Sequence, residues 1–417
     1  MMIGATTLII GIFGRWKNDK MDDMVTADFL IIGGGVVGLS IARALRKEYS
    51  DASVVVIEKE PTCGQHASGR NSGVIHAGFY YSPDSLKARL TRQGNILLTE
   101  YCIERGVPLK RCGKLVVTKN EDDFSTLDEL FERGRKNGVP LQEVSAEDIR
   151  EIEPRAKTHK RALFSPTTSA LDPAIFLQTL VKDVSQSGVQ IYNNTTYLGR
   201  KWNQIITQSE RFSANFIINA AGLYADRIAQ DFGFGKEYRI VPFKGLYLLS
   251  NEPVGAFKTH IYPVPCLNNP FLGVHITVST DGQAKLGPTA LPALWREHYQ
   301  GFDNFHLKEL LEISLAHGRL LFTSSHFRRL AVQELLKYSR GFLISEANYL
   351  ARGILKKNFL CWGKSGIRAQ LVNSRHGRLV MDFVLEGDKH SFHILNTVSP
   401  GLTCAFSFAE YVCRKIR

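Results

Sequence analysis

Cysteine is scarce and irregularly spaced in this chain. Among 417 residues there are seven cysteines, and no two of them form a C-x-x-C pair. An odd number without that spacing argues against a disulfide framework and against a structural zinc site. The cysteine pattern therefore favours a reducing compartment, and the sequence predicts no metal centre. The seven are Cys63, Cys102, Cys112, Cys266, Cys361, Cys404 and Cys413.

Long uninterrupted apolar runs are also missing. The apolar run from Ile3 to Phe13 is shorter than the roughly 18–20 residues that cross a bilayer. It lacks the basic and small-residue flanks of a signal peptide. We interpret residues 1–26 as an extension, either unstructured or the product of a spurious upstream start, with the first strand beginning near Ala27. An amphitropic anchor that uses the basic residues of this segment is the alternative.

Acidic residues are outnumbered by basic ones. The chain has 40 Asp and Glu against 52 Lys and Arg, a formal charge of +12 at pH 7. Such a balance can favour an acidic substrate, an anionic membrane surface or nucleic acid; the alternative is an ordinary basic solvated surface, because Lys and Arg are scattered along the chain. No run of five or more Lys and Arg interleaves with aromatics, which argues against nucleic acid. We therefore predict a cytoplasmic protein without a membrane span, and a peripheral contact with an anionic inner membrane stays open.

The most informative feature present is a glycine loop between two apolar strands. The loop has the spacing G-x-G-x-x-G, an apolar helix follows it, and the second strand ends on Glu58. Gly33 permits the tight turn, Gly35 lets a pyrophosphate lie against the backbone, and Gly38 lets the helix pack closely. The helix N-terminus offers free N–H groups to phosphates, and the Glu58 carboxylate can accept hydrogen bonds from a ribose. This unit predicts dinucleotide binding.

The rest of the chain alternates helical and strand-like segments. Helices are predicted over residues 84–106, 121–137 and 173–187, from about 224, within 303–357 and from about 402. Residues 240–290 alternate strand-like runs with Pro and Gly turns. A return to strands and a helix at the C-terminus implies a discontinuous nucleotide-binding domain. We assign it residues 27–100, 150–235 and 358–417, and a substrate-binding domain residues 101–149 and 236–357.

Several segments carry a narrower signature than the glycine loop. They are GQHASGRNSGVIHAGFYYSPDSLKARL (64–90), INAAGLYADRIA (218–229), VPFKGLYLL (241–249), HIYPVP with PFLGVHITVSTDG (260–282), LGPTALPALWREHY (286–299), GIRAQLV (366–372) and LVMDFVLEGDKHSFHILNTVSPGLTCAFSFAEYV (379–412). Together they resemble the D-amino-acid-oxidase-like flavoproteins, most closely the L-2-hydroxyglutarate oxidases and dehydrogenases. The resemblance runs from residue 27 to the end.

The resemblance implies an α/β fold. A Rossmann-type, discontinuous FAD-binding domain is expected beside a sheet-rich α+β substrate-binding domain, with FAD as the cofactor. A loop of small and polar residues would offer N–H groups and one guanidinium to the phosphates, a second turn would contact FAD, and the last helix would direct its N-terminus at the flavin. These cofactor-binding candidates are Ser68, Arg70, Asn71 and Ser72, then Ala221 and Gly222, then Gly401, Leu402 and Thr403.

The implied reaction is the oxidation of a small 2-hydroxy acid, L-2-hydroxyglutarate to 2-oxoglutarate. A hydride passes to flavin N5, and a base must take the hydroxyl proton; histidine has a suitable pKa. His76 and His275 stand in the narrow motifs, and the sequence does not distinguish which is the base; His66 is a weaker candidate. Some relatives tether FAD through a histidine in a run comparable to that of His76, but non-covalent FAD is expected here.

Three residues are predicted to bind the substrate carboxylates. Arg368 resembles a late arginine that members place near flavin and substrate, and its planar fork suits a carboxylate. Lys244 belongs to the strand-rich region, where a solvated edge lysine is the alternative. Tyr262 offers a phenol donor.

Other activities stay open at this point. The same fold serves amino-acid or sarcosine-type amine oxidases and glycerol-3-phosphate dehydrogenases. An RNA-directed flavoprotein would need salt-dependent RNA binding. The electron acceptor is expected to be oxygen or a membrane quinone.

Overall fold

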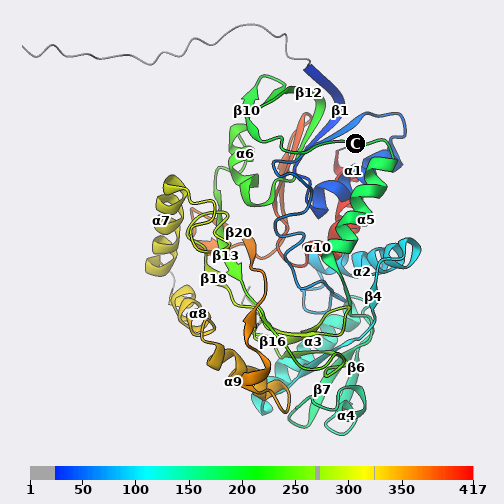
Figure 1. The fold of residues 1–417 in the computed structure, drawn as a ribbon, viewed down its shortest axis with the longest axis vertical. Helices are drawn as coiled ribbons and strands as arrows, with labels where there is room; N and C mark the ends of the chain where they lie inside the picture. The colour runs from blue at the N-terminus through cyan, green and yellow to red at the C-terminus, as the bar shows by residue number, and fades with distance from the viewer. Residues whose placement is uncertain (1–23, 268–272, 324, 417) are drawn as a thin grey trace, which may run out of the picture.

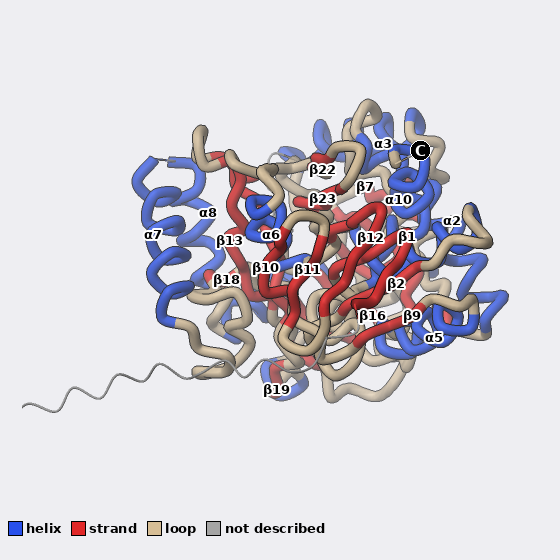
Figure 2. Tube along the Cα trace, turned by 90° about the horizontal axis from the view of Figure 1, so that it is seen from above, coloured by secondary structure: helices blue, strands red, loops and turns tan. Residues whose placement is uncertain are grey.

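Two large β-sheets organise the chain, one in the upper and one in the lower half of Figure 1. The computed structural model describes residues 24–267, 273–323 and 325–416. Viewed from above in Figure 2, helices α2, α5 and α10 cover one side of the first sheet, while α7 and α8 lie at the opposite edge of the molecule.

The first sheet is parallel at its centre. β1 (Met24–Ile32) lies between β2 (Val54–Ile57) and β12 (Arg211–Asn219), in parallel register with both. The other strands of this sheet are β9 (Gln190–Tyr192), β10 (Tyr197–Lys201), β11 (Gln204–Thr207), β22 (Val384–Gly387) and β23 (Ser391–Asn396). The last three residues of β1 and all of β2 are buried, as expected for parallel strands covered by helices.

The start of β1 corrects one prediction. The strand begins at Met24, because Met24 pairs with Arg211 of β12, so residues 24–26 belong to the sheet and not to the extension. The remainder of the predicted extension, residues 1–23, lies outside the described residues.

Local signals place the covering helices. α2 (Leu86–Arg105) begins where the Ser85 hydroxyl accepts a hydrogen bond from the Ala88 N–H, and it ends at Gly106, which has a φ of +66°. α5 (Pro173–Gln186) begins at Asp172, whose carboxylate accepts from two backbone N–H groups. These features confirm the helices predicted over 84–106 and 173–187. α1 (Val36–Glu48) and α10 (Gly401–Lys415) complete this layer.

The second sheet has an apolar face and a polar face. Its strands are β19 (Cys361–Trp362), β14 (Leu248–Leu249), β17 (Ala284–Gly287), β16 (His275–Val278), β15 (His260–Pro263), β5 (Lys114–Val117), β7 (Arg161–Ser165) and β6 (Gln142–Ser145). Leu115, Ile261 and Ile276 pack in one core with residues of α9 (Arg340–Leu350). Because successive side chains of a strand alternate, their neighbours Lys114, Tyr262 and His275 face the other way.

Two smaller sheets connect these layers. β13 (Tyr238–Gly245) pairs with β18 (Leu291–Pro292) and β20 (Gly366–Asn373), and β20 pairs with β21 (Arg378–Leu379). β3 (Val74–Ile75), β8 (Ser169–Leu171) and β4 (Leu109–Lys110) form the other. The remaining helices are α3 (Phe124–Lys136), α4 (Ile149–Ile152), α6 (Ala225–Asp231), α7 (Leu307–Thr323) and α8 (Ser325–Leu336).

The sheets do not follow the predicted domain boundaries at residues 150 and 358. β7 falls in a segment assigned to the nucleotide-binding domain, yet it pairs with β5 and β6 of the second sheet. β20 likewise pairs with β13. Which strands pair depends on contacts between distant segments, and the composition along the chain does not predict these contacts.

Candidate functional site

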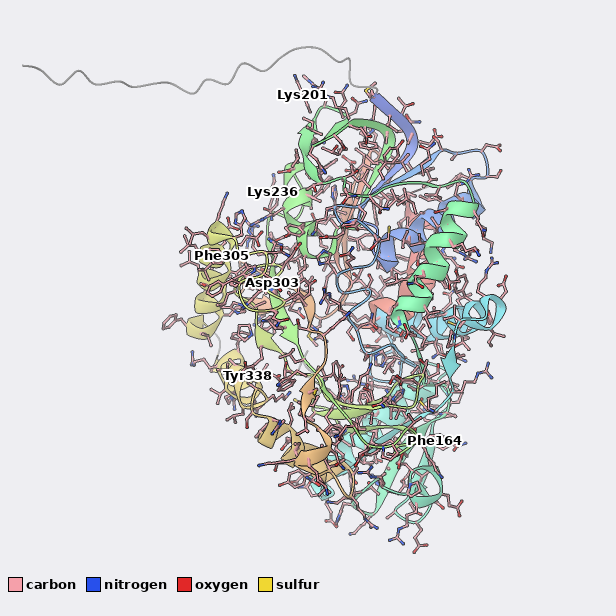
Figure 3. The ribbon with its side chains drawn as sticks, in the orientation of Figure 1. Phe164, Lys201, Lys236, Asp303, Phe305 and Tyr338 are labelled. Atoms are coloured by element: carbon pink, nitrogen blue, oxygen red, sulfur yellow. The ribbon has the colours of Figure 1, made fainter. Side chains whose placement is uncertain are left out.

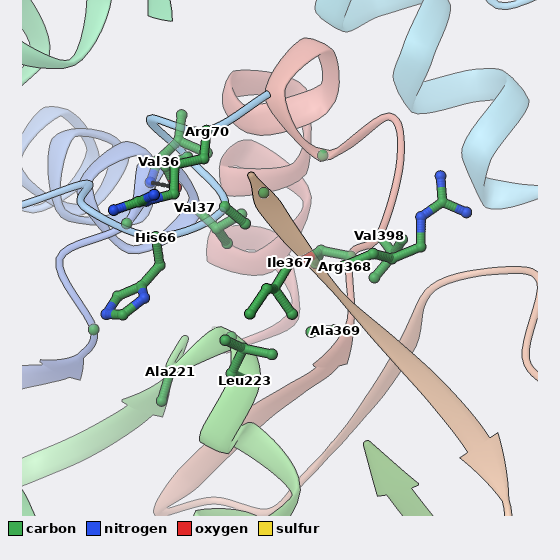
Figure 4. A pocket seen from close by; sticks show the side chains of 18 of the residues that line it. Val36, Val37, His66, Arg70, Ala221, Leu223, Ile367, Arg368, Ala369 and Val398 are labelled. Carbon is green, nitrogen blue, oxygen red and sulfur yellow. Dashed lines mark hydrogen bonds between the residues drawn. The ribbon is translucent and has the colours of Figure 1, made fainter. Parts of the chain in front are cut away.

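A cavity of about 1050 Å³ lies where the first sheet meets the other sheets. It is lined by the glycine loop after β1, the end of β2, the N-terminus of α10, strands β13 and β20, and residues of β15 and β16. Figure 4 shows Arg70 and His66 at one end of the labelled side chains and Arg368 at the other. This volume suits a large ligand together with a small one.

The glycine loop can be built only from glycine at two of its positions. Gly33 has a φ of +112°, and a Cβ there would lie 2.6 Å from the Ala220 carbonyl oxygen. A Cβ on Gly38 would lie 2.0 Å from the Gly33 oxygen, so Gly38 serves helix packing and does not line the cavity. Gly35 does line it, and a Cβ there would meet only the Ser68 Oγ, at 3.0 Å. A side chain at Gly35 would therefore occupy space next to the cavity.

Glu58 is held rigidly at the end of β2. One carboxylate oxygen accepts the Gly34 N–H at 2.8 Å and the other accepts the Glu60 N–H at 2.9 Å. The residue is 8% exposed and lines the cavity. A carboxylate has about four lone-pair sites, so acceptor capacity remains for the hydroxyls of a ribose. The glycine loop offers backbone N–H groups and Glu58 offers carboxylate oxygens, and together these groups fit a dinucleotide.

The polar loop after β2 uses much of its hydrogen-bonding capacity on itself. The Ser68 hydroxyl accepts the Val36 N–H at the start of α1, at 2.9 Å. The Asn71 amide donates to the carbonyls of Ala67 and Ser68 and accepts from the Gly73 N–H. The side-chain amide of Asn71, predicted to bind the cofactor, therefore shapes the loop.

Arg70 is also engaged within the protein. Its guanidinium donates to the carbonyls of Gln65 and Ser365 and lies 4.2 Å from the centre of the Tyr299 ring. Arg70 and Ser72 both line the cavity, as predicted, and a hydrogen bond joins Ser72 to Tyr247.

The second predicted contact and the last helix reach the same cavity. Ala221 and Gly222 line it at the end of β12, and Gly401, Leu402 and Thr403 line it at the start of α10. The positive end of the α10 dipole thus faces the space where negative charge would be stabilised. The Thr403 hydroxyl accepts the His76 N–H at 3.0 Å, so it ties α10 to the segment that follows β3.

His275 is presented to the cavity as a neutral base. Its Nδ1 lies 2.9 Å from the Gly273 carbonyl oxygen, which can only accept, so Nδ1 carries the hydrogen and Nε2 a free lone pair. Burial lowers the pKa of His275 to about 3. The Tyr262 ring stacks on this imidazole at 3.9 Å between ring centres. Both residues line the cavity.

His76 lies in the same electrostatic environment. Burial holds its pKa well below the ordinary value, and Lys114, His275 and His260 lower it further. Besides burial, Lys114 depresses the pKa of both imidazoles, and Lys337 further depresses that of His275. Both histidines are therefore unprotonated at neutral pH.

Arg368 and a cluster of tyrosines complete this end of the cavity. Arg368 pairs with Phe243 across β20 and β13, and it interacts electrostatically with Tyr247 and Tyr81. Tyr247 lines the cavity and was missed by the sequence analysis, although it stands in the same VPFKGLYLL segment as Lys244. Burial raises the pKa of Tyr247 to about 12, so the phenol keeps its proton.

The structure does not bring Lys244 to the cavity. Phe243 and Gly245 line it, but Lys244 between them does not, because alternate residues of a strand face opposite sides. Lys244 acts electrostatically on His298 and is acted on by Asp303 instead. The cavity lining therefore does not include Lys244, and its contact with a substrate carboxylate stays a prediction.

His66 lines the cavity, yet its ring nitrogens are occupied. Nε2 lies 2.9 Å from a Glu60 carboxylate oxygen and Nδ1 lies 2.7 Å from the Tyr299 hydroxyl. His66, Glu60 and Glu297 lie close enough to hold a cation, and the Lys59 ammonium already pairs with both carboxylates. This arrangement favours a structural role for His66.

Comparison with known proteins connects this geometry to a family. A family model described as FAD dependent oxidoreductase matches residues 28–415. The chain is 36% identical over 415 residues to the mitochondrial L-2-hydroxyglutarate dehydrogenase of Homo sapiens, covering 94% of this chain and 88% of that protein. It is 32% identical over 397 residues to L-2-hydroxyglutarate dehydrogenase of Escherichia coli, covering 94% and 93%.

A solved structure shows the same fold. The FAD-bound, dithionite-reduced L-alpha-glycerophosphate oxidase of Mycoplasma pneumoniae matches with a TM-score of 0.74 at 24% identity, covering 94% of this chain and 95% of that one. The predicted fold class and the resemblance drawn from the sequence segments are confirmed.

Proposed function

The chain belongs to the family of FAD-dependent oxidoreductases whose model spans residues 28–415, and we propose that it oxidises L-2-hydroxyglutarate to 2-oxoglutarate. FAD is the cofactor. The relatives that share 32% and 36% of its residues over nearly their whole length are L-2-hydroxyglutarate dehydrogenases. The observation that carries the proposal is a single cavity lined by the dinucleotide-binding loop, by Arg368 and by two unprotonated histidines.

The residues of the glycine loop, Glu58 and the start of α10 would hold the cofactor. Gly35 offers bare backbone, Glu58 offers acceptors to the ribose, and the N-termini of α1 and α10 offer positive dipole ends. When bound, FAD accepts the hydride that leaves the substrate carbon. Because the His76 imidazole is assigned no tether, the flavin is expected in the supernatant when the denatured protein is precipitated.

The hydroxyl proton is assigned to His275. Its Nε2 lone pair is available at every pH well above about 3, because the Gly273 carbonyl holds the hydrogen on Nδ1 and burial disfavours the imidazolium. His76 is the second candidate for this proton. The stacked Tyr262 ring limits the rotation of the His275 imidazole and so keeps Nε2 in one direction.

The substrate carboxylates are assigned to Arg368 and Tyr262. A guanidinium presents two parallel N–H donors to a carboxylate. Burial and neighbouring tyrosines raise the pKa of Tyr262 well above its ordinary value, so its hydroxyl stays a donor. The ammonium of Lys114, which acts on both histidines, attracts a dianion and repels the ammonium of an amino acid or of sarcosine. This argument favours a 2-hydroxy dicarboxylate over an amine.

Anaerobic titration of the purified yellow protein tests the proposal. L-2-hydroxyglutarate should bleach the flavin absorbance with one equivalent, and D-2-hydroxyglutarate, sarcosine and a neutral amino acid should not. Glycerol 3-phosphate is the control that matters most, because it is also an anion with a secondary hydroxyl. Bleaching by glycerol 3-phosphate or sarcosine, with none by L-2-hydroxyglutarate, would contradict the assignment.

The electron acceptor is proposed to be a membrane quinone reached from an anionic bilayer surface. None of the described helices has both the length and the apolarity to cross a bilayer. α7 and α8 nevertheless expose large apolar side chains, and Figure 3 shows the neighbouring Phe305 and Tyr338 on the same flank of the molecule. These exposed residues include Leu307, Leu311, Leu315, Phe322, Val332 and Leu335.

The charge of this apolar surface matches anionic lipid. Exposed Lys308, Arg328 and Arg329 accompany it. Glu309 and Glu334 on the same helices are buried, and the exposed Glu312 pairs with Arg227. Apolar side chains beside Lys and Arg are typical of helices that lie in a membrane interface. We therefore propose a cytoplasmic enzyme that binds the inner surface of the membrane peripherally.

Vesicle sedimentation tests this contact. The enzyme should sediment with vesicles that contain phosphatidylglycerol at low salt and be released at high salt, because salt screens the attraction. Leu315→Glu with Phe322→Glu should abolish sedimentation, whereas Ile103→Glu, at an exposed position on α2, should not. Sedimentation unaffected by salt and by the double substitution would contradict the proposed surface. Turnover that is rapid with oxygen and absent with a soluble quinone would exclude a quinone as the electron acceptor.

A further inference from the structure

Lys114 is a buried lysine beside the cavity to which no contact with cofactor or substrate has been assigned. It lies on β5 with 0% exposure, and among the described residues its Nζ has no hydrogen-bond partner. Burying an ammonium without a partner is strongly unfavourable, and lysines are almost never fully buried unless they are paired. An unpaired buried lysine at this place therefore calls for a functional reason.

Aromatic rings form the surroundings of Lys114. Its Nζ lies 4.6 Å from the ring centre of Phe79, 4.3 Å from that of Tyr80 and 4.9 Å from that of Tyr262. The faces of these rings attract a cation and compensate part of the lost hydration. They do not neutralise the charge, so the positive potential remains.

The sheet register places Lys114 on the same face of the second sheet as Tyr262. β5 runs parallel to β15, with Lys114 opposite His260 and Val116 opposite Tyr262. Lys114 and Tyr262 therefore face the same side of the sheet, away from the apolar core that contains Leu115. Tyr262 lines the cavity, and the Nζ of Lys114, which is not among the lining residues, lies 4.9 Å from the centre of its ring.

The charge of Lys114 reaches groups that line the cavity. It lowers the pKa of both His76 and His275. Tyr262 interacts in turn with Tyr247 and Tyr81, the same tyrosines that interact with Arg368. Lys114 and Arg368 thus act on one tyrosine cluster at the catalytic end of the cavity.

We propose that Lys114 is a specificity-determining residue that selects dianionic over monoanionic substrates, because its unneutralised ammonium gives the cavity a positive potential that a second carboxylate satisfies. The ammonium does not touch the ligand and acts through the low-dielectric wall of aromatic rings and imidazoles. The inference deepens the proposed function and rests on it only in taking a small carboxylate as the ligand.

The proposal predicts a pH signature. Burial lowers the pKa of Lys114 to about 7, so the residue is charged below that pH and neutral above it. The titratable groups that face it stay in one state near pH 7: His76, His260 and His275 stay neutral, and Tyr80, Tyr262 and Cys112 stay protonated. Lys110 is the other cation that faces His260. The preference for a dianion should therefore weaken as the pH rises through about 7.

Binding constants of two matched ligands test this inference on the holoenzyme. 2-Oxoglutarate and 2-oxopentanoate have the same chain length, and they differ in the second carboxylate. Their dissociation constants are measured from the perturbation of the flavin absorbance between about pH 6 and about pH 8.5. The wild-type preference for 2-oxoglutarate should fall by about tenfold over this range.

Two variants separate charge from structure. Lys114→Arg should keep the preference at every pH, because a guanidinium stays charged, and Lys114→Met should lack it at every pH. A preference that does not change with pH in the wild type would overturn the proposal, as would an unchanged preference in Lys114→Met. If Lys114→Met does not retain flavin, the pH dependence of the ligand preference in the wild type and in Lys114→Arg tests the proposal.

The measurement is independent of turnover. If L-2-hydroxyglutarate fails to reduce the flavin while 2-oxoglutarate still binds with the pH-dependent preference, the proposed function is wrong and the role of Lys114 stands. If neither ligand binds to the wild type, the role of Lys114 is overturned.

Discussion

The two ends of the cavity are built in different ways. Much of the dinucleotide end consists of backbone groups and glycines of one stretch of chain, residues 33–58, with Gly33, Gly35 and Glu58 fixed by hydrogen bonds and close contacts. The catalytic end consists of side chains from strands far apart in the sequence, including His76, His275 and Arg368. The first end depends on shape, so one added side chain should abolish it. The second depends on charge and direction, so substitutions there should change rates and affinities while the cofactor stays bound.

A side chain in the dinucleotide end should have the largest effect. Gly35→Leu is expected to give a folded but colourless protein, because its side chain would point past Ser68 into space that the cofactor needs. Flavin absorbance per mole of protein measures the loss, with circular dichroism to show folding. Gly318→Leu is the matched control, because a Cβ at Gly318 meets nothing within 4 Å. Full flavin absorbance in Gly35→Leu would remove this loop from the cofactor site.

Removing the assigned base should slow flavin reduction while FAD stays bound. His275→Gln is expected to lower the rate by about 10²-fold or more, the usual scale for a general base, and His76→Gln should lower it less. Anaerobic stopped-flow absorbance measures the rate, and His376→Gln, at an exposed position, serves as the control. A greater loss of the flavin reduction rate in His76→Gln than in His275→Gln would make His76 the base. Near-normal rates in both variants would exclude a histidine base.

Substitution of the assigned carboxylate ligand should change affinity by a smaller factor. Arg368→Lys is expected to raise the KM for L-2-hydroxyglutarate by about tenfold, because an ammonium cannot make the paired contact of a guanidinium. Lys244→Met should leave KM almost unchanged, because Lys244 does not line the cavity. Steady-state kinetics with an artificial acceptor measure both. A larger increase of KM in Lys244→Met than in Arg368→Lys would support the carboxylate contact predicted for Lys244.

The smallest expected effect is on stability against acid. His260 and His275 have pKa values of about 3 in the folded protein because they are buried, while an unfolded histidine has its ordinary value of about 6.5. At pH values between about 3 and about 6.5, these histidines bind protons in the unfolded chain and do not bind them in the folded chain. The free energy of unfolding therefore decreases as the pH falls below about 6.5. The melting temperature should drop by a few degrees between about pH 7 and about pH 5.

The variant His275→Gln should show a weaker dependence of melting temperature on pH, because one of these histidines is gone. Scanning calorimetry at several pH values, at constant ionic strength, measures the slope. The backbone donors of the dinucleotide end do not titrate, so Gly35→Leu should keep the wild-type slope. An equal slope in His275→Gln would show that other groups determine the acid sensitivity.

What the sequence determined by itself follows rules that act over a few residues. A tight turn with positive φ requires glycine at Gly33, and the capping residues Ser85 and Asp172 begin α2 and α5 where the chain places them. The contacts of these residues lie within the same loop, turn or adjacent strand. The glycine loop, the ends of these helices and the carboxylate of Glu58 were therefore predictable from local pattern.

Only the tertiary structure decided the properties that depend on which distant segments meet. The pairing of β7 with the second sheet, the turn of Lys244 away from the cavity and the proximity of Lys114 to Tyr262 arise from strand register. The tautomer of His275 likewise depends on the position of the Gly273 carbonyl. Composition and spacing do not encode such contacts, because they are set by the packing of the whole core, and the face that a strand residue presents reverses with a shift of one residue in register.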